Sequence, residues 1–231
     1  FFLIAGFLLT FTVSSALVQL SLSEVVDDAS ALVTSTVTDL RGLQAPSDVR
    51  LALERRVLST ASRYPGASIV LLESPIDGAA PRRGPQVSGP WAHTSDVPEF
   101  PQWLSASEEG LVITEIMGRS TLAARAGQRI DIGQGVAVVI ADLPLTGSTI
   151  RRMEATSGTA LLEAAAGVGV VEVGTESVSE QTVSLARPGG TVEALGGLSW
   201  ASFFDLRDWM TGEQGRGALT FQVRPAVFYE Q

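Results

Sequence analysis

The sequence has 231 residues, of which 45% are hydrophobic, so it can bury a core and is not disordered throughout. Its 16 basic and 25 acidic residues give a net charge of −9, which argues against a nucleic-acid partner. The chain contains no cysteine, lysine or asparagine, and its single histidine is His93. Disulfides, thiolate zinc sites, catalytic thiols and lysine chemistry are therefore excluded, and we expect no metal or cofactor in this segment.

Residues 1–23 carry no charged side chain. A run of about 20 predominantly apolar residues is long enough to cross a bilayer as a helix. The sequence therefore predicts a transmembrane helix over residues 1–23, with the lipid bilayer as a partner. Two alternatives stay open here, namely a cleaved signal sequence and a buried helix of a soluble protein.

Residues 24–43 continue the helical pattern without a proline or glycine before Gly42, but with one polar face. We expect a stalk helix that relays a signal, and a homodimer that forms through it. Asp27 and Asp28 are interpreted as its solvated face, and an ordinary core helix is the alternative. The predicted relay and contact residues are Val25, Ala29, Leu32, Val33, Val37 and Leu40.

Residues 44–224 are predicted to form an extracytoplasmic α+β domain. Ser47 has the character of an N-cap for a helix over residues 48–63, and a buried strand is expected over residues 67–72. The sequence then predicts a helix over residues 146–166 within a mostly antiparallel sheet. The remaining expected strands cover residues 111–117, 128–132, 136–141, 168–173, 182–185 and 219–223, and residues 225–231 are expected to begin a second helix that approaches the membrane.

Residues 73–103 hold six of the 11 prolines, which predicts a long loop without regular structure. Aromatic residues gather at the end of this loop and again near residues 200–210, and aromatic side chains line ligand pockets as well as cores. A ligand pocket between these segments is one hypothesis, and simple core packing is the other. The predicted ligand-binding residues are Trp91, Trp103, Trp200, Asp205, Asp208 and Trp209.

The carboxylates Asp205, Asp208 and Glu213 lie close together in the sequence. Grouped carboxylates can act as general acid and base in a hydrolase. A membrane-anchored extracytoplasmic hydrolase is therefore an alternative of another class, and an envelope assembly domain is a further one.

Several short motifs of residues 40–231 resemble one family. They are Arg63-Tyr64-Pro65-Gly66, Val97-Pro98 with Pro101-Gln102-Trp103, Ala141-Asp142-Leu143-Pro144-Leu145, Thr211-Gly212-Glu213 and Arg224-Pro225 before Phe228-Tyr229. Together they resemble the N-terminal sensor region of bacterial membrane-bound serine/threonine phosphatases of the SpoIIE/PP2C (RsbU-like) type. The order of two helices before a sheet is also similar to Cache-type sensors of histidine kinases and chemoreceptors.

The resemblance implies an input module in a bacterial inner membrane, with its domain on the extracytoplasmic side. This segment would bind an unknown small ligand or an envelope protein and would itself catalyse nothing. The phosphatase domain, with its divalent metal, would lie outside this segment.

Overall fold

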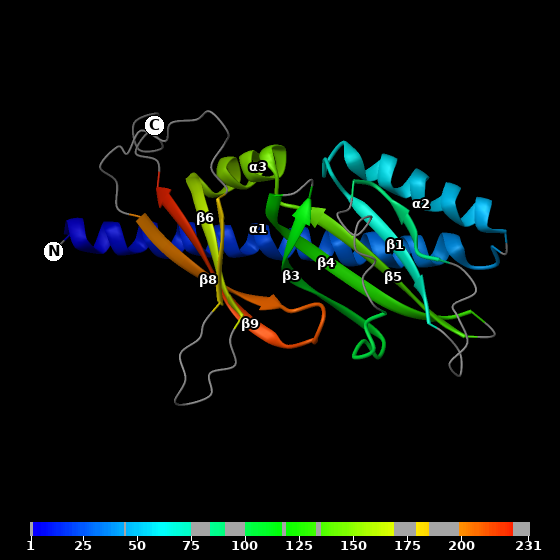
Figure 1. The fold of residues 1–231 in the computed structure, drawn as a ribbon. Helices are drawn as coiled ribbons and strands as arrows, with labels where there is room; N and C mark the ends of the chain where they lie inside the picture. Colours follow the sequence, from blue (N-terminus) through cyan, green and yellow to red (C-terminus); the bar gives the residue numbers. More distant parts are fainter. Residues whose placement is uncertain are drawn as a thin grey trace, which may run out of the picture. The chain divides into compact units, whose positions relative to one another are not determined.

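The structure is a computed structural model that describes residues 2–43, 45–74, 84–90, 100–116, 119–132, 135–168, 179–184 and 199–223. Within these ranges, side chains are described except at residues 2–8, 10, 115–120, 162–200 and 222–223. The described residues form three helices and nine strands (Figure 1). The elements are α1 Phe2–Leu40, α2 Pro46–Ala61, β1 Ser68–Glu73, β2 Gln86–Ser88, β3 Ser107–Ile116, β4 Arg119–Asp131, β5 Val136–Pro144, α3 Gly147–Ser157, β6 Thr159–Val168, β7 Ser179–Ser184, β8 Ser199–Arg207 and β9 Gln214–Val223.

Helix α1 runs for 39 residues without interruption; Gly6 is its one glycine, and residues 7–40 contain neither proline nor glycine. Gly42 follows it with a φ of 84°, a left-handed conformation that glycine adopts without strain. In the part of the chain that the structure describes, none of the helices has the length and apolar character needed to cross a membrane.

The first half of α1 has buried side chains from Ser14 onward. Val18 is fully buried and Ser14 nearly so. The Ser15 hydroxyl donates to Ser202 Oγ over 3.2 Å, and the Gln19 amide donates to the same oxygen over 3.3 Å. A helix face that packs on protein is not surrounded by lipid, so the predicted membrane segment of residues 1–23 overlaps protein packing from residue 14 onward.

The chain divides into two compact units. Unit 1 comprises Phe1–Glu24, Gly147–Leu206 and Gln214–Gln231, and unit 2 comprises Val25–Thr146 and Arg207–Glu213. The boundary at Glu24 and Val25 falls inside α1, so one helix contributes residues to both units. The sequence predicts one domain over residues 44–224 and gives no sign of this division.

Unit 2 contains a five-stranded antiparallel arrangement in the order β2-β1-β5-β4-β3. Strand β5 lies between β1 and β4, and its residues are buried along almost their whole length. This explains the continuous apolar sequence of β5, because a central strand covered on both faces has no polar side. Helix α2 contacts β1 and β2 (Figure 1).

Unit 1 contains strands in the order β8-β9-β6-β7, together with α3. The predicted helix over residues 146–166 is wrong after Ser157, because residues 159–168 form β6. Gly158, with a φ of 67°, ends the helix in a left-handed conformation. The alanines that follow have a high helix propensity, and their pairing with β9 overrides it and makes the segment a strand.

Three further details differ from the sequence prediction. Helix α2 begins with Pro46 at its first turn and has no side-chain cap, whereas Ser47 was expected to be that cap. Strand β2 lies inside the proline-rich segment, because three residues between prolines can still pair with β1. Strand β8 was not expected.

The predicted strand over residues 168–173 and the helix over residues 225–231 lie almost entirely outside the described residues.

Candidate functional site

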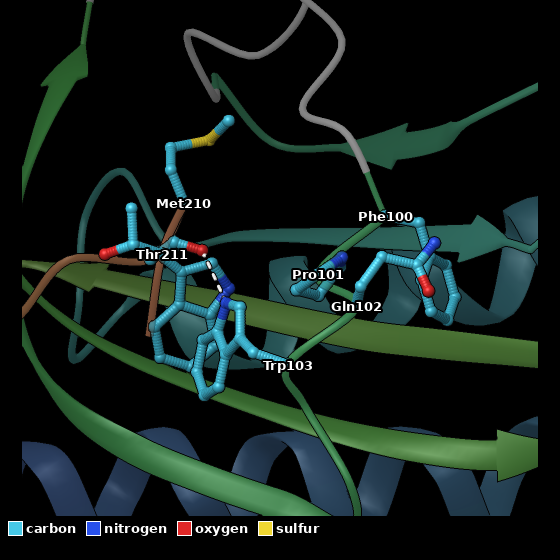
Figure 2. Close-up of a pocket in the computed structure, with 7 residues that line it drawn as sticks. Phe100, Pro101, Gln102, Trp103, Met210 and Thr211 are labelled. Carbon is cyan, nitrogen blue, oxygen red and sulfur yellow. Dashed lines mark hydrogen bonds between the residues drawn. The ribbon is translucent and has the colours of Figure 1, made fainter. Parts of the chain in front are cut away.

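Two tryptophans that are distant in the sequence meet in unit 2. Trp103 follows the proline-rich segment, and Trp209 lies in the turn between β8 and β9. Their rings pack edge to face, with centroids 5.2 Å apart and planes at 80°. The Trp103 indole N–H donates to the backbone oxygen of Trp209 over 3.0 Å (Figure 2). The stacking and the hydrogen bond together fix one indole against the other.

Two glycines make room for these rings. A Cβ atom on Gly127 of β4 would lie 2.9 Å from Cζ2 of Trp209. A Cβ atom on Gly212 would lie 2.6 Å from Cδ2 of Trp103, and Gly212 also has a φ of +80°. Each indole therefore rests directly on the backbone of a glycine.

A pocket of about 270 Å³ opens beside the indoles. Figure 2 shows that Met210 and Thr211 lie near Trp103, while Phe100, Pro101 and Gln102 follow the other wall. The volume is just under the range of about 300–1,000 Å³ that is usual for drug-sized ligands, so the pocket suits a smaller molecule. Trp209 also belongs to the core cluster of unit 2, which joins side chains of β1, β3, β4 and β5. The pocket is thus built on the core of its own unit.

Each of the three aromatic rings that line the pocket has an arginine guanidinium stacked on it. Arg207 lies 5.4 Å from the ring centroid of Trp103, Arg125 lies 5.5 Å from that of Trp209, and Arg129 lies 5.8 Å from that of Phe100. Strand β4 carries Arg125, Gly127 and Arg129 at every second position, so these three residues lie on one face of the strand.

A buried ion pair lies behind Trp209. Arg125 donates from Nε and Nη2 to the two oxygens of Asp142, over 2.6 and 2.7 Å. The two residues are Cα partners on β4 and β5, and only 5% of Arg125 and 1% of Asp142 are exposed. Burial raises the pKa of Asp142, and the charge and hydrogen bonds of Arg125 oppose that rise. The second oxygen contact gives the pair a fixed, fork-like geometry.

The structure brings only part of the predicted ligand site together. Trp103 and Trp209 meet, and both line the pocket. Asp208 instead supports its own turn, because its Oδ1 accepts from the backbone N–H of Met210 over 2.8 Å. Asp205 is an exposed residue of β8 and belongs to unit 1. Trp91 and the side chain of Trp200 lie outside the described residues.

The carboxylates behind the hydrolase hypothesis belong to different compact units. Asp205 is part of unit 1, whereas Asp208 and Glu213 are part of unit 2. Among the described residues, no group of three or more side chains is arranged to hold a metal ion. The arrangement therefore offers no observation in favour of the hydrolase.

The predicted relay residues form one apolar face of α1 that is already covered within the chain. Between 0 and 8% of each of Val25, Ala29, Leu32, Val33, Val37 and Leu40 is exposed. A second copy cannot reach this face while the chain keeps its structure, so the predicted homodimer contact through these residues is not supported. Their role as relay residues stays a prediction.

Polar contacts hold the same half of α1 in unit 2. Asp28 accepts from the Tyr64 hydroxyl and pairs with Arg63 over 3.0 Å, so it is not a free solvated residue. Asp39 pairs with Arg56 of α2. The hydrogen bond from Arg56 lowers the pKa of Asp39. The sequence did not predict these contacts of Asp28, because its partners Arg63 and Tyr64 lie 35 and 36 residues away along the chain.

The sequence matches no family model, and it matches no curated protein. It is similar in structure to several solved sensor domains. The periplasmic domain of LuxQ from Vibrio cholerae has a TM-score of 0.42 at 11% identity, with 95% of this chain and 99% of that chain covered.

Two chemoreceptor domains are similar to the same extent. The ligand-binding domain of CtaA from Pseudomonas fluorescens, in complex with L-isoleucine, has a TM-score of 0.41 at 16% identity and covers 94% and 90% of the two chains. That of PctC from Pseudomonas aeruginosa, in complex with GABA, has a TM-score of 0.42 at 15% identity and covers 90% and 94%. At TM-scores below 0.5, the function of this chain has to be argued from its own residues. None of the three matches is a SpoIIE/PP2C phosphatase, so that resemblance stays a prediction.

Proposed function

We propose that the chain is a small-ligand sensor module whose binding site is the pocket of Trp103 and Trp209 in unit 2. The observation that carries the proposal is the pocket itself. It is formed by segments 106 residues apart in the sequence, and it rests on the core of the unit that also buries the second half of α1.

A ligand in this pocket has a physical route to α1. Displacing Trp209 would disturb the core cluster and the Arg125–Asp142 pair in the same unit. Helix α1 is held in that unit by Asp28 and Asp39, and it continues without a break into unit 1. A shift in the population of two arrangements of unit 2 would then change the restraints on the whole helix.

The proposal keeps the expected place of the sensor on the extracytoplasmic side of a bacterial inner membrane, and it does not use residues 1–23 as the anchor, because Ser14 and Val18 of that segment are buried. The neighbours described above are a LuxQ domain and two chemoreceptor domains. We therefore include an output of the histidine-kinase or chemoreceptor type beside the SpoIIE/PP2C phosphatase. The reading frame that adjoins this segment in the gene distinguishes these outputs directly.

The binding experiment uses the complete chain and four named probes, which are L-leucine, L-isoleucine, GABA and benzoate. A ligand that binds only the folded state raises the melting temperature, and the indoles report occupancy through their fluorescence. We expect at least one probe to stabilise the wild type and the Phe203→Ala control, but not Trp103→Ala. Phe203 is a suitable control because it is 66% exposed and belongs to unit 1. If no probe acts, or if Trp103→Ala responds like the wild type, the proposal is wrong.

A further inference from the structure

The charges around the pocket do not balance. Arg125 is paired with Asp142, and Arg207 is paired with Glu108 over 3.2 Å. Arg129 has no carboxylate partner among the described residues, and its Nη1 donates only to the backbone oxygen of Leu104, over 3.3 Å. Of the three arginines stacked on the pocket rings, Arg129 is therefore the one without a carboxylate partner in the part of the chain that the structure describes.

Arg129 is not itself a lining residue, but it contacts a segment that lines the pocket. Its guanidinium stacks on Phe100 and bonds to Leu104, so it contacts the segment that supplies Phe100, Pro101, Gln102 and Trp103 to the lining. The side chain is only partly exposed, so water screens its charge less than that of a surface arginine.

A second group on the pocket also lacks a partner. The Trp209 indole N–H is buried and has no hydrogen-bond acceptor among the described residues, although only 8% of Trp209 is exposed. An indole nitrogen can donate but cannot accept. A buried donor without an acceptor is costly, so a ligand that displaces Trp209 and offers an acceptor would relieve this cost.

The described lining carries no negative charge. Its polar side chains are Gln102 and Thr211, and none of its described members carries a carboxylate. An ammonium group would also lie near Arg129, which has no carboxylate partner among the residues that the structure describes. The remaining lining is aromatic or apolar, which suits a flat hydrophobic body.

From these observations we infer that the pocket takes a small aromatic or apolar carboxylate without an ammonium group, whose charge is met by Arg129. The inference rests on the proposed function, because it names the ligand class of the same pocket. Because Arg129 does not line the pocket in this structure, the carboxylate would accept from its guanidinium after a movement of the lining, while the ring of the ligand would pack on the indoles of Trp103 and Trp209.

The test compares three probes that share one ring and differ in charge, namely benzoate, benzamide and benzylamine. Binding to the complete chain is measured by calorimetry and by tryptophan fluorescence. Benzoate is expected to bind at least about tenfold more tightly than benzamide, as one charge-assisted hydrogen bond allows, and benzylamine is expected not to bind. Equal binding of benzoate and benzamide would overturn the inference.

Variants at Arg129 test whether this residue supplies the positive charge that favours benzoate. Arg129→Gln should weaken benzoate binding by about tenfold or more and leave benzamide binding unchanged. Arg129→Lys keeps a positive charge and should retain part of the preference for benzoate, which tests the inference even if the glutamine variant folds poorly. Arg50→Gln is the matched control, because Arg50 is an exposed arginine of α2 in the same unit and pairs only with Glu54, over 3.6 Å. If Arg50→Gln and Arg129→Gln have the same effect, the inference fails.

The two proposals fail in different ways. Binding of L-leucine or GABA that needs Trp103, without any binding of benzoate, overturns the carboxylate inference and leaves the sensor proposal standing. Benzoate binding that needs Arg129 but not Trp103 contradicts the pocket in both proposals. An absence of binding by every probe overturns both.

Discussion

Single glycines decide whether the two indoles can meet. Gly127 and Gly212 each lie where any Cβ atom would fall within 3 Å of a ring carbon. Ring carbons of a buried indole cannot move aside as the end of a flexible chain can, so the rings themselves would be displaced. The pocket therefore depends on Gly127 and Gly212, which have no side chain that could contact a ligand.

Gly127→Ala is expected to lower the free energy of unfolding by about 1–3 kcal/mol, the usual cost of overpacking a core. The new methyl group would press on Trp209, so the near-ultraviolet circular dichroism of the tryptophans should change as well. Gly84→Ala is the control, since nothing lies within 4 Å of its Cβ position. Urea unfolding monitored by far-ultraviolet signal measures both variants, and equal midpoints would contradict the account of Gly127.

The buried Arg125–Asp142 pair also depends on single residues, because each partner compensates the buried charge of the other. Removing one partner should cost about 3–5 kcal/mol, since a buried charge is left alone. Arg125→Met and Asp142→Leu together should cost much less than the sum of the single variants. A double-mutant cycle from urea unfolding measures this, with Arg50→Met on the exposed pair as the control. Additive losses would show that the two side chains act independently.

At the scale of elements, α1 is joined to its unit by ion pairs whose partners come from other elements. Asp39 pairs with Arg56 of α2, and about a third of each side chain is exposed. Pairs with this exposure contribute little to stability, typically about 0.2–1 kcal/mol. Their value lies in fixing the position of the helix, since they act beside the buried face of Val33 and Val37.

The pH dependence of this pair has a definite sign. The pKa of Asp39 lies below its ordinary value of 3.8, chiefly because Arg56 donates a hydrogen bond to it. The stabilisation is therefore complete above that ordinary value and is lost as the pH falls through the lower folded value. The difference in stability between wild type and Asp39→Asn, about 0.5 kcal/mol at neutral pH, should disappear as the pH falls through the lowered folded pKa of Asp39.

Urea unfolding of both proteins at several pH values measures this difference. Asp27→Asn serves as the control, because Asp27 is exposed on the same helix. A difference that persists at the lowest pH would show that the carboxylate charge of Asp39 is not its cause.

At the scale of the whole molecule, one helix is shared by two compact units. The boundary between Glu24 and Val25 has helical backbone on both sides. A continuous helix transmits a restraint along its axis because its hydrogen bonds close every fourth residue. The division of the chain into units and the continuity of α1 together provide the proposed relay.

Breaking the helix at this boundary should therefore have a local, measurable effect. Ser23 is exposed, so Ser23→Pro removes a backbone donor and disturbs the preceding turn without changing a buried contact. The expected loss is about 3 kcal/mol of helix stability, seen as faster hydrogen exchange of the amides around residues 19–27. Ser23→Ala should leave exchange unchanged, and equal exchange in both variants would contradict the proposed continuity.

The sequence by itself determined the mixed α+β class of the fold and several of its elements. The apolar run of residues 1–23 and the period-3.6 pattern of residues 24–43 predicted α1, and the branched apolar runs predicted β1 and β5. These signals are local, because the spacing of apolar residues within a segment depends only on whether that segment is a helix or a strand. The same local signals extended α3 through residues 159–166, where pairing with β9 overrides propensity.

The tertiary structure alone decided the site. The meeting of Trp103 with Trp209, the Arg125–Asp142 pair and the stacking of Arg129 on Phe100 all join segments separated along the chain. The tryptophans could be proposed from their aromatic character, but nothing in the sequence marked Gly127 as a contact of Trp209 or Arg129 as a residue stacked on Phe100. Which side chains share a face of β4, and what lies over that face, is fixed only when the strands pair and the chain packs on them.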